Sequence, residues 1–382
     1  MKVLIVGAGV AGLTIAQMLH AAEIDFDIIE RSENGEPERQ GFIIGLWSSG
    51  RSVLKKLALS DAFDSKAAPT HEARFFRGDG SLLKRISFRD LEKRDGAGLA
   101  GIKRRDLYSI LLTRLDANTI RYKQTLTNIV QKGEVVTVTF SDDSTMTYDL
   151  VVGADGAKSW VREHSFQQHL ETYTNWRVWC AWVPKKFETR HALAAYIEPK
   201  ELGVVVHTHD AAMVWLVTPT DHTVWDTEEG RVERLTKYFS SITTLIPGAL
   251  HHGDDHQIPV SDFMEVTMSH LVQGRIALIG DAAHCLGPYT GFSSSMAMED
   301  AYILGRELTK AQNGSGTIDD ALHRYEKIRM PRIELVRKIN STIRRIVLSE
   351  SPLARKFFNL VLRVIPAGFI RYAAGLVTRG NV

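Results

Sequence analysis

The start of the chain alternates short apolar runs with a longer segment of helical spacing. VLIV (3–6) is apolar throughout and rich in β-branched residues, which is typical of a buried parallel strand. After a glycine-rich stretch, LTIAQMLHAA (13–22) has helical spacing and good helix formers. FDIIE (26–30) is a second short apolar run. The pattern predicts strand, helix and strand, which form one βαβ unit.

The middle of the chain has the alternation of half-buried strands. Apolar and polar residues alternate from 119 to 148, with turn signals near 132 and 142, and an apolar run follows at 150–153. This predicts a β-meander that leads into a buried strand. Further strand patterns occur at 175–186, 191–199, 202–209 and 211–220. With the helical pattern at 230–242, they predict a mostly antiparallel sheet and a helix beside it.

The last third of the chain predicts helices. An apolar run at 276–280, preceded by Arg275, leads through a turn into a long helical pattern. A further helix is expected from Pro331, a residue type favoured at the first helical position. It would place five apolar residues on one face: Leu335, Ile339, Ile343, Ile346 and Val347. The segment 353–364 repeats this pattern.

The glycines after the first strand point to nucleotide binding. Gly7 permits a tight turn, Gly9 lets the backbone approach a pyrophosphate, and Gly12 allows close helix–strand packing. Glu30, at the end of the second strand, offers a carboxylate to ribose hydroxyls. The similar run GAGLAG (96–101) lacks a preceding apolar strand, so we expect a loop there.

Two further strands end in acidic turns. Asp155 follows the apolar run at 150–153 in the sequence GADGAKSWVR, and Asp281 follows the run at 276–280. Since ligands bind at the carboxyl ends of parallel strands, both carboxylates are expected near the same nucleotide.

With these three motifs in this order, the chain resembles the class A, single-component flavoprotein monooxygenases with the p-hydroxybenzoate hydroxylase fold. The motifs are the glycines with Glu30, the D-G pair Asp155-Gly156, and the G-D pair Gly280-Asp281 with Pro288 downstream. The family commonly has G-Q-G-x-N after that proline, whereas this chain has GFSSS, in which Phe292 offers an aromatic ring to the flavin edge or to wall packing.

The resemblance implies FAD as the cofactor and NADPH or NADH as co-substrate. Glu30 would hold the adenosine ribose, Arg104 the ribose–pyrophosphate side and Asp281 the ribityl chain, while Asp155 would link FAD to NAD(P)H recognition. The implied cofactor-binding residues are Gly7, Gly9, Ala11, Gly12, Glu30, Arg31, Arg104, Asp155, Gly280, Asp281, Pro288 and Gly291. His284 lies close to Asp281, but GDAAH is common in the family, so no catalytic residue is assigned.

The expected fold class is α/β, with a Rossmann-like FAD-binding domain, an inserted, mostly antiparallel substrate sheet and C-terminal helices. The FAD-binding domain would be discontinuous, over 1–70, 96–165 and 266–325. Residues 71–95 and 166–265 would form the substrate domain, and 326–382 the C-terminal helices. The substrate sheet would cover the flavin with an apolar wall. Its tryptophans, whether ligand contacts or ordinary core, are Trp176, Trp179, Trp182 and Trp215.

Composition and charge add three expectations. Two cysteines, Cys180 and Cys285, are too few for a disulfide framework, which favours a reducing, cytoplasmic location, and no metal site is expected. From Pro331 onward there are ten Lys and Arg against two acidic residues, although the whole chain carries only +2. These basic helices would pack on the FAD domain, line the substrate cavity or contact a membrane surface. We expect no nucleic-acid partner.

The implied reaction is hydroxylation of an aromatic or polycyclic apolar small molecule with NAD(P)H and oxygen, through a flavin hydroperoxide. Phenols, quinolones, polyketide aromatics and tetracycline-like compounds would all suit the expected cavity. Two other functions remain open, because function depends on the site and not on the fold. One is a flavin dehydrogenase or reductase, and the other a flavin- and ligand-binding protein without turnover.

Overall fold

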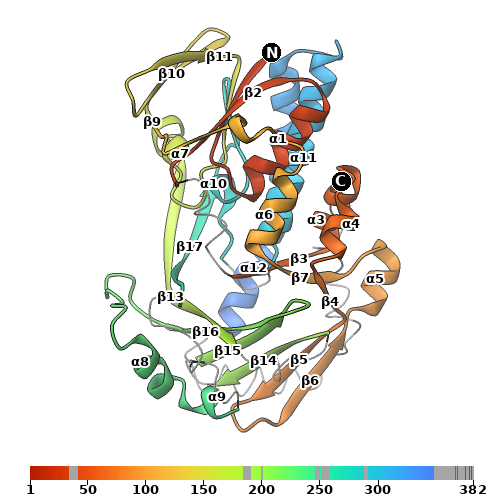
Figure 1. Cartoon of the computed structure of the whole chain (residues 1–382), viewed down its shortest axis with the longest axis vertical. Helices are drawn as coiled ribbons and strands as arrows, with labels where there is room; N and C mark the ends of the chain where they lie inside the picture. Colours follow the sequence, from red (N-terminus) through yellow and green to blue (C-terminus); the bar gives the residue numbers. More distant parts are fainter. Residues whose placement is uncertain are drawn as a thin grey trace.

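A computed structural model gives the fold in two sheet-containing halves (Figure 1). The structure describes residues 1–33, 42–183, 191–198, 201–245, 250, 258–287 and 291–347, together with Pro366, Gly368, Gly375, Thr378 and Gly380. The upper half in Figure 1 holds both the N-terminal strand and the long helices, and the lower half holds a large sheet. The extended strand β13 (His169–Val183) reaches from one half to the other.

The upper half is built on a six-stranded sheet of order β18-β19-β12-β1-β2-β8. Its strands are β1 (Lys2–Val6), β2 (Asp25–Glu30), β8 (Ile120–Tyr122), β12 (Leu150–Gly153), β18 (Val272–Gln273) and β19 (Ile276–Leu278). All neighbours are parallel except β18 and β19. The central strands are buried on both faces, which explains their uninterrupted apolar runs.

Helices cover one face of this sheet and a small sheet covers the other (Figure 1). The helices of the upper half are α1 (Val10–Ala21), α3 (Ser48–Lys56), α4 (Ser60–Asp64), α6 (Arg104–Leu112), α11 (Ser293–Gln312) and α12 (Ile318–Val347). Helix α11 lies against α1, α3 and α12. The small sheet is the predicted antiparallel meander of β9 (Leu126–Lys132), β10 (Val135–Phe140) and β11 (Thr145–Tyr148).

The lower half is a seven-stranded sheet of order β17-β13-β16-β15-β14-β5-β6. Besides β13, its strands are β5 (Glu72–Arg77), β6 (Leu82–Ser87), β14 (Ala192–Glu198), β15 (Glu201–His207), β16 (Ala212–Pro219) and β17 (Val260–Met268). Only β14 and β5 pair in parallel. Helices α8 (Arg231–Tyr238) and α9 (Ser240–Leu245) cover one face, where Leu235, Phe239 and Ile242 pack on the sheet.

The remaining elements are short. They are β3 (Ile43–Leu46), β4 (Ala68–Thr70) and β7 (Leu99–Lys103), which form a three-stranded sheet, and α5 (Arg89–Asp95), α7 (Trp160–Ser165), α10 (Asp281–His284) and the 3₁₀ turn Ala117–Thr119. The expected α/β fold class, with a mostly antiparallel second sheet, is therefore confirmed.

The second glycine run differs from the prediction. Gly96 ends α5 with φ +72°, where a residue without Cβ is favoured, but Gly101 lies inside β7 and not in a loop. A Cβ on Gly101 would overlap the carbonyl oxygen of His207, so this glycine permits close packing between backbones.

The C-terminal helix was predicted with the wrong start, and its predicted apolar face is only partly buried: Ile339 packs against the main core, but Leu335 is exposed. Helix α12 begins at Ile318, where Thr317 and Asp320 cap each other, and Pro331 lies inside it. The predicted domain boundary after residue 325 therefore falls within one helix. Its buried side carries Val336, whereas Leu335 is 38% exposed. The predicted helix at 353–364 lies outside the described residues.

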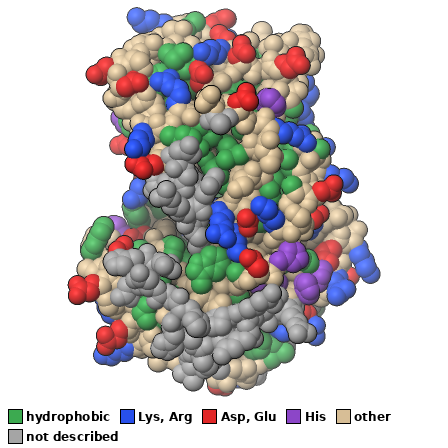
Figure 2. All heavy atoms as spheres, in the orientation of Figure 1, with side chains coloured by type: hydrophobic (Ala, Val, Ile, Leu, Met, Phe, Trp, Pro, Cys, Tyr) green, Lys and Arg blue, Asp and Glu red, His purple; other side chains and the backbone are tan. Residues whose placement is uncertain are grey.

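Charge is mixed over the visible surface. Figure 2 shows basic and acidic side chains interspersed over one face of the molecule, with some hydrophobic side chains near the middle of the view. Among the described residues, no helix is both long enough and apolar enough to cross a membrane.

Candidate functional site

Three neighbouring parallel strands end at the same edge of the six-stranded sheet. The N–H of Ala154, after β12, donates to Val6 O at 2.8 Å, and the N–H of Ile279, after β19, donates to Gly153 O at 3.0 Å. The Gly7 turn, the Asp155 turn and the Gly280-Asp281 turn are therefore adjacent. The structure brings together the three motifs that lie far apart in the sequence.

Close packing explains two of the three N-terminal glycines. Gly7 has φ +104°, and a Cβ there would lie 2.5 Å from Ala154 O. A Cβ on Gly12 would overlap the carbonyl oxygen of Gly7. By contrast, a Cβ on Gly9 would meet no atom within 4 Å. The backbone at Gly9 thus borders open space, as an approaching pyrophosphate requires.

The same open space lies at the N-terminus of α1. Among the described residues, no side chain caps this end of the helix, and its first turn has no acidic residue. The helix dipole and the first N–H groups favour an anion at such a position. The local chemistry therefore fits the phosphates of a dinucleotide.

Glu30 and Arg104 flank this turn. The Glu30 carboxylate accepts hydrogen bonds from the N–H groups of Ala8 and Ser32, both at 2.9 Å, and keeps lone pairs for further donors. Arg104 begins α6 and lies 5.3 Å from the Phe42 ring centre. Burial lowers the pKa of Arg104, and the nearby Glu30 carboxylate opposes this shift. Arg31, by contrast, is exposed.

Asp155 is engaged within its own turn. Its carboxylate accepts from Ser159 Oγ at 2.5 Å and from the N–H of Val161 at 3.1 Å, which holds the start of α7. Burial raises the pKa of Asp155, although these hydrogen bonds oppose the shift. Arg162, which the sequence did not single out, joins this turn to α10. Its guanidinium donates to Ala157 O at 2.6 Å and to Ala282 O at 2.8 Å.

Asp281 is the first residue of α10 and follows a glycine turn. Gly280 has φ +62°, and a Cβ there would lie 3.0 Å from the Cβ of Ala11, so this turn sits against α1. Burial raises the pKa of Asp281, while His284 opposes that shift. Gly291, before α11, also has positive φ, and Pro288 lies outside the described residues.

A buried charge network, not predicted from the sequence, supports the Gly280 turn. Asp300 Oδ2 accepts from the Gly280 N–H at 2.8 Å and contacts His284 Nε2 at 2.5 Å, while Oδ1 accepts from Arg329 at 2.7 Å. Arg329 and Arg332 also bind Glu299. Burial opposes ionisation of Asp300, but His284 and Arg329 outweigh it and hold the pKa of Asp300 below its usual value. His284 thus takes part in a structural network.

Phe292 packs against protein. Its ring is stacked on Trp47, with ring centres 4.9 Å apart and planes at 19°, and it is 6% exposed. The backbone N–H of Trp47 donates to Ser295 Oγ at 3.0 Å. Of the two roles considered for Phe292, wall packing is the one that these contacts support. Trp47 was not singled out because no sequence motif marks it.

The face of the seven-stranded sheet away from α8 and α9 forms an apolar wall. Strand register pairs Cys180 with Trp215, Trp215 with Val204, Val204 with Ala195 and Ala195 with Phe75. Paired residues share a face, so this row crosses five strands on one side. At its end, Phe75 packs against the main core, which includes the six-stranded sheet. The wall therefore faces the half that holds the three turns.

The middle of this wall is more exposed than its other face. Cys180, Val204 and Trp215 are half-buried, whereas Val205 and Leu216 on the opposite face are at most 2% exposed beneath α8 and α9. Trp182 is half-buried on the wall as well, while Trp176 and Trp179 are almost fully buried. Two of the four tryptophans are thus core residues, and Trp182 and Trp215 are partly exposed.

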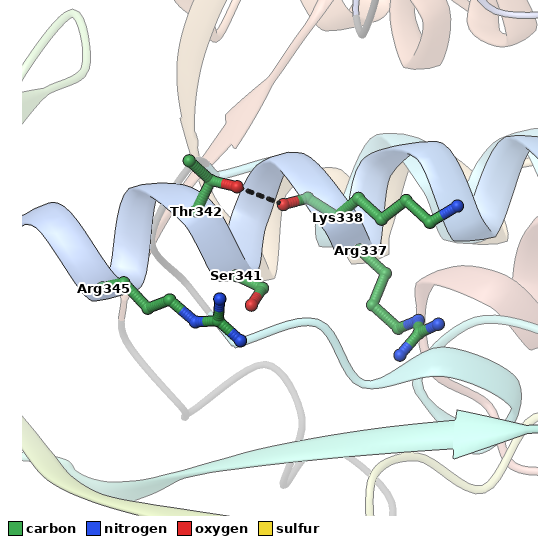
Figure 3. Close-up of a pocket in the computed structure, with 5 residues that line it drawn as sticks. All are labelled: Arg337, Lys338, Ser341, Thr342 and Arg345. Carbon is green, nitrogen blue, oxygen red and sulfur yellow. Dashed lines mark hydrogen bonds between the residues drawn. The ribbon is translucent and has the colours of Figure 1, made fainter.

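A basic hollow lies along α12 (Figure 3). It encloses about 300 Å³ and is lined by Arg337, Lys338, Ser341, Thr342 and Arg345. In Figure 3, Arg337 and Arg345 point to the same side of the helix, on either side of Ser341. Three of the ten basic residues that follow Pro331 thus line a concave surface.

Comparisons with known proteins agree with this geometry. Residues 1–339 match a family described as "FAD binding domain". The chain is 30% identical over 376 residues to the 2-heptyl-3-hydroxy-4(1H)-quinolone synthase of Pseudomonas aeruginosa, over 96% of this chain and 94% of that one. It is 26% identical over 344 residues to the FAD-dependent urate hydroxylase of Klebsiella pneumoniae, over 87% of each.

A solved structure has the same fold. Klebsiella pneumoniae HpxO, in complex with FAD and uric acid, matches with a TM-score of 0.89 over 100% of this chain and 97% of that chain, at 22% identity. The predicted family resemblance and the predicted FAD cofactor are confirmed by these matches. The chain belongs to the FAD binding domain family and is an FAD-dependent monooxygenase.

Proposed function

We propose that this enzyme uses NAD(P)H and oxygen to hydroxylate a planar aromatic or polycyclic apolar molecule, and that it works in the reducing cytoplasm. The observation that carries the proposal is the apolar wall, which faces the half with the three adjacent strand-end turns. The relative at 30% identity, named as a quinolone synthase, favours a fused bicyclic heteroaromatic ring over a larger polycycle.

We assign the cofactor contacts from the geometry of the turns. Gly9, Ala11 and Gly12 bring backbone N–H groups to the pyrophosphate of FAD. Gly7 forms the tight turn before them, and its own N–H donates to Ile29 O at 2.8 Å. Glu30 accepts from the adenosine ribose hydroxyls, with Arg104 beside it. Gly280 and Asp281 take the ribityl side, and Gly291 shapes the backbone before α11. Arg31 and Pro288 remain predicted contacts of FAD: Arg31 is exposed, and Pro288 lies outside the described residues. Asp155 acts mainly by holding its turn in place.

The protein supplies orientation and exclusion of water. When bound, FAD accepts a hydride from NAD(P)H and activates oxygen for transfer. The N-terminus of α11 directs backbone N–H groups toward the flavin edge, which stabilises negative charge there. The wall row of Cys180, Val204 and Trp215 keeps the substrate ring in an apolar setting and limits water.

Oxygen-dependent NAD(P)H oxidation by the purified holoenzyme tests the reaction. A library of phenols, quinolones and tetracycline-like compounds is screened for stimulation of this oxidation and for products heavier by one oxygen atom. Stimulation with a product of that mass supports hydroxylation. NAD(P)H oxidation with electron transfer to an added acceptor, but without oxygen insertion, would point to the dehydrogenase function instead.

Asp281→Ala is expected to weaken FAD retention by about 1–3 kcal/mol, the usual cost of losing a buried hydrogen-bond partner. The dissociation constant for FAD, measured by flavin fluorescence, reports the effect. Asp61→Ala is the control, since Asp61 lies exposed on α4 of the same half. Equal FAD affinity in both variants would contradict the role assigned to Asp281.

A further inference from the structure

The basic hollow along α12 offers side-chain donors on one side of the helix. Arg337, Ser341 and Arg345 are spaced by four residues, so their side chains are neighbours on the helix surface. In Figure 3, both arginines point to the same side, with Ser341 between them. Arg345 and Thr342 are exposed, so the hollow of about 300 Å³ opens to solvent. A small polar ligand can therefore enter it without a change in the fold.

The protein leaves part of the positive charge at this hollow without a counter-charge. Lys338 has a carboxylate partner on its own helix, and Arg344, beside the hollow, pairs with Glu265 at 3.3 Å. Within the described residues, the guanidinium groups of Arg337 and Arg345 make no ion pair and no hydrogen bond. Arg337 is close enough to Glu265 to oppose the rise that burial causes in the pKa of that carboxyl. Four cations here therefore share two carboxylates.

Ser341 supplies a hydroxyl donor between the two arginines. A serine or threonine inside a helix can bond the carbonyl oxygen four residues earlier. Thr342 does so, since its Oγ1 donates to Lys338 O at 2.9 Å (Figure 3). The half-buried Ser341 makes no such bond, nor any other side-chain hydrogen bond within the part of the chain that the structure describes. Its hydroxyl is therefore available to a ligand in the hollow.

The charge and shape of these donors favour a phosphate monoester. A guanidinium group presents a planar fork of N–H donors that matches phosphate oxygens. A phosphate monoester carries about 1.5–2 negative charges at pH 7, which matches the excess of cations over carboxylates. A carboxylate or a phosphodiester carries a single negative charge and would leave part of this excess unpaired. Because the hollow is open, the anion keeps part of its hydration and loses little on entry.

We propose that the basic hollow is a binding site for a phosphate monoester, with Arg337 and Arg345 on either side of the phosphate and Ser341 donating between them. FAD contains no phosphate monoester, so this site is separate from the contacts assigned to that cofactor. The ligand is therefore a second phosphorylated molecule.

The position of the hollow favours the 2′-phosphate of NADPH as the source. Asn340, next to Ser341, donates to Gly287 O at 3.3 Å. Gly287 belongs to the segment between α10 and α11, and the N-terminus of α11 is assigned to the flavin edge. The hollow thus borders the region where a nicotinamide nucleotide approaches FAD. This choice of source rests on the proposed function, whereas the site itself does not. A phosphatidic acid headgroup carries the same chemical group and is the other source.

Two ligand pairs test the site in the FAD-loaded protein, by isothermal titration calorimetry and by vesicle sedimentation. NADP⁺ and NAD⁺ differ only in the 2′-phosphate, and neither reacts with oxidised FAD. Vesicles with phosphatidic acid or with phosphatidylglycerol carry a phosphate monoester and a phosphodiester, respectively. We expect NADP⁺ to bind about tenfold or more tightly than NAD⁺, since charge-assisted hydrogen bonds contribute at least that factor. The affinity for NADP⁺ should fall as the salt concentration is raised.

Variants on α12 assign the preference to the hollow. Arg345→Gln removes a cation and Ser341→Asp adds a negative charge, so each should weaken NADP⁺ binding about tenfold and leave NAD⁺ binding unchanged. Lys327→Gln is the control, since Lys327 is exposed on the same helix outside the hollow. Because Arg345 is exposed, the flavin content and the midpoint of thermal unfolding of Arg345→Gln should match those of the wild type. A preference that survives in both hollow variants would refute the assignment.

The outcomes separate this site from the function proposed above. A preference for phosphatidic acid that is lost in Arg345→Gln, with equal affinity for the two nucleotides, supports the phosphate site and assigns it to a lipid. No preference within either pair overturns the proposal, even if the protein binds FAD and oxidises NAD(P)H with oxygen. If the protein prefers NADP⁺ but oxidises neither NADPH nor NADH, the proposed function fails and the site remains.

Discussion

Replacing Gly12 with alanine is expected to destabilise the first βαβ unit by about 3 kcal/mol or more and to abolish FAD retention. The new methyl group would overlap the carbonyl oxygen of Gly7, and a backbone atom cannot move aside as a flexible side chain can. Helix α1 would have to shift away from β1. Chemical denaturation of the apo-protein measures the first effect, and the flavin content of the purified protein measures the second.

Gly9→Ala is the matched control, since it adds the same methyl group three residues before Gly12. A Cβ at Gly9 meets nothing within 4 Å, and Gly9 has φ −77°, which alanine adopts readily. The apo-protein should therefore keep its stability within about 0.5 kcal/mol. Its affinity for FAD should fall about tenfold or more, because the methyl group occupies the space left for the pyrophosphate. A loss of stability as large as in Gly12→Ala would contradict this interpretation.

Arg329→Met is expected to lower the free energy of unfolding by about 3–5 kcal/mol. Arg329 and its two partners, Glu299 and Asp300, are fully buried, so removal of the guanidinium leaves two adjacent carboxylates without their shared cation. Denaturant unfolding at neutral pH gives the size of the loss. The loss should shrink at low pH, where the carboxylates of the variant take up protons and no longer need a partner.

Lys338→Met gives the comparison on the same helix. Lys338 is 72% exposed and pairs with Glu334 at 3.8 Å, an i,i+4 contact that is worth at most about 0.5 kcal/mol. Lys338→Met should therefore change the free energy of unfolding by no more than that amount. If Arg329→Met were equally mild, the buried network would contribute little to holding α11 and α12 together.

The motifs that could be recognised in the sequence are those that depend only on residues close together in the chain. A glycine turn between an apolar strand and a helix is local, so Gly7, Gly9 and Gly12 were assigned from their neighbours alone. The alternation at 119–148 likewise predicted the meander, because the two faces of β10 differ in burial. Strand order was harder to predict from the sequence. The acidic turns after β12 and β19 nevertheless indicated that these strands end at the same edge of one sheet. Their parallel pairing places them there.

The features that were missed depend on contacts between distant segments. Trp47 stacks on Phe292, 245 positions later, and Asp300 binds Arg329 from another helix, so neither has a local signal. Pro331 was taken as a helix start because proline is favoured there, but Thr317 and Asp320 cap the helix earlier. The side of α12 that is buried is the one that packs against α11 and carries Arg329, so Leu335 lies on the exposed side.

The strand order also constrains folding during synthesis on the ribosome. Strand β1 leaves the ribosome first, but it lies between β12 and β2, and β19 is made only when residues 276–278 appear. Both sheets recruit strands from widely separated parts of the chain, since β5 pairs with β14, about 120 residues later. At about 5–20 residues per second, β1 waits roughly 7 seconds or longer for its neighbour β12, and β12 waits about as long again for β19. Nascent chains stalled before residue 276 should therefore be more readily bound by chaperones than chains released after α11.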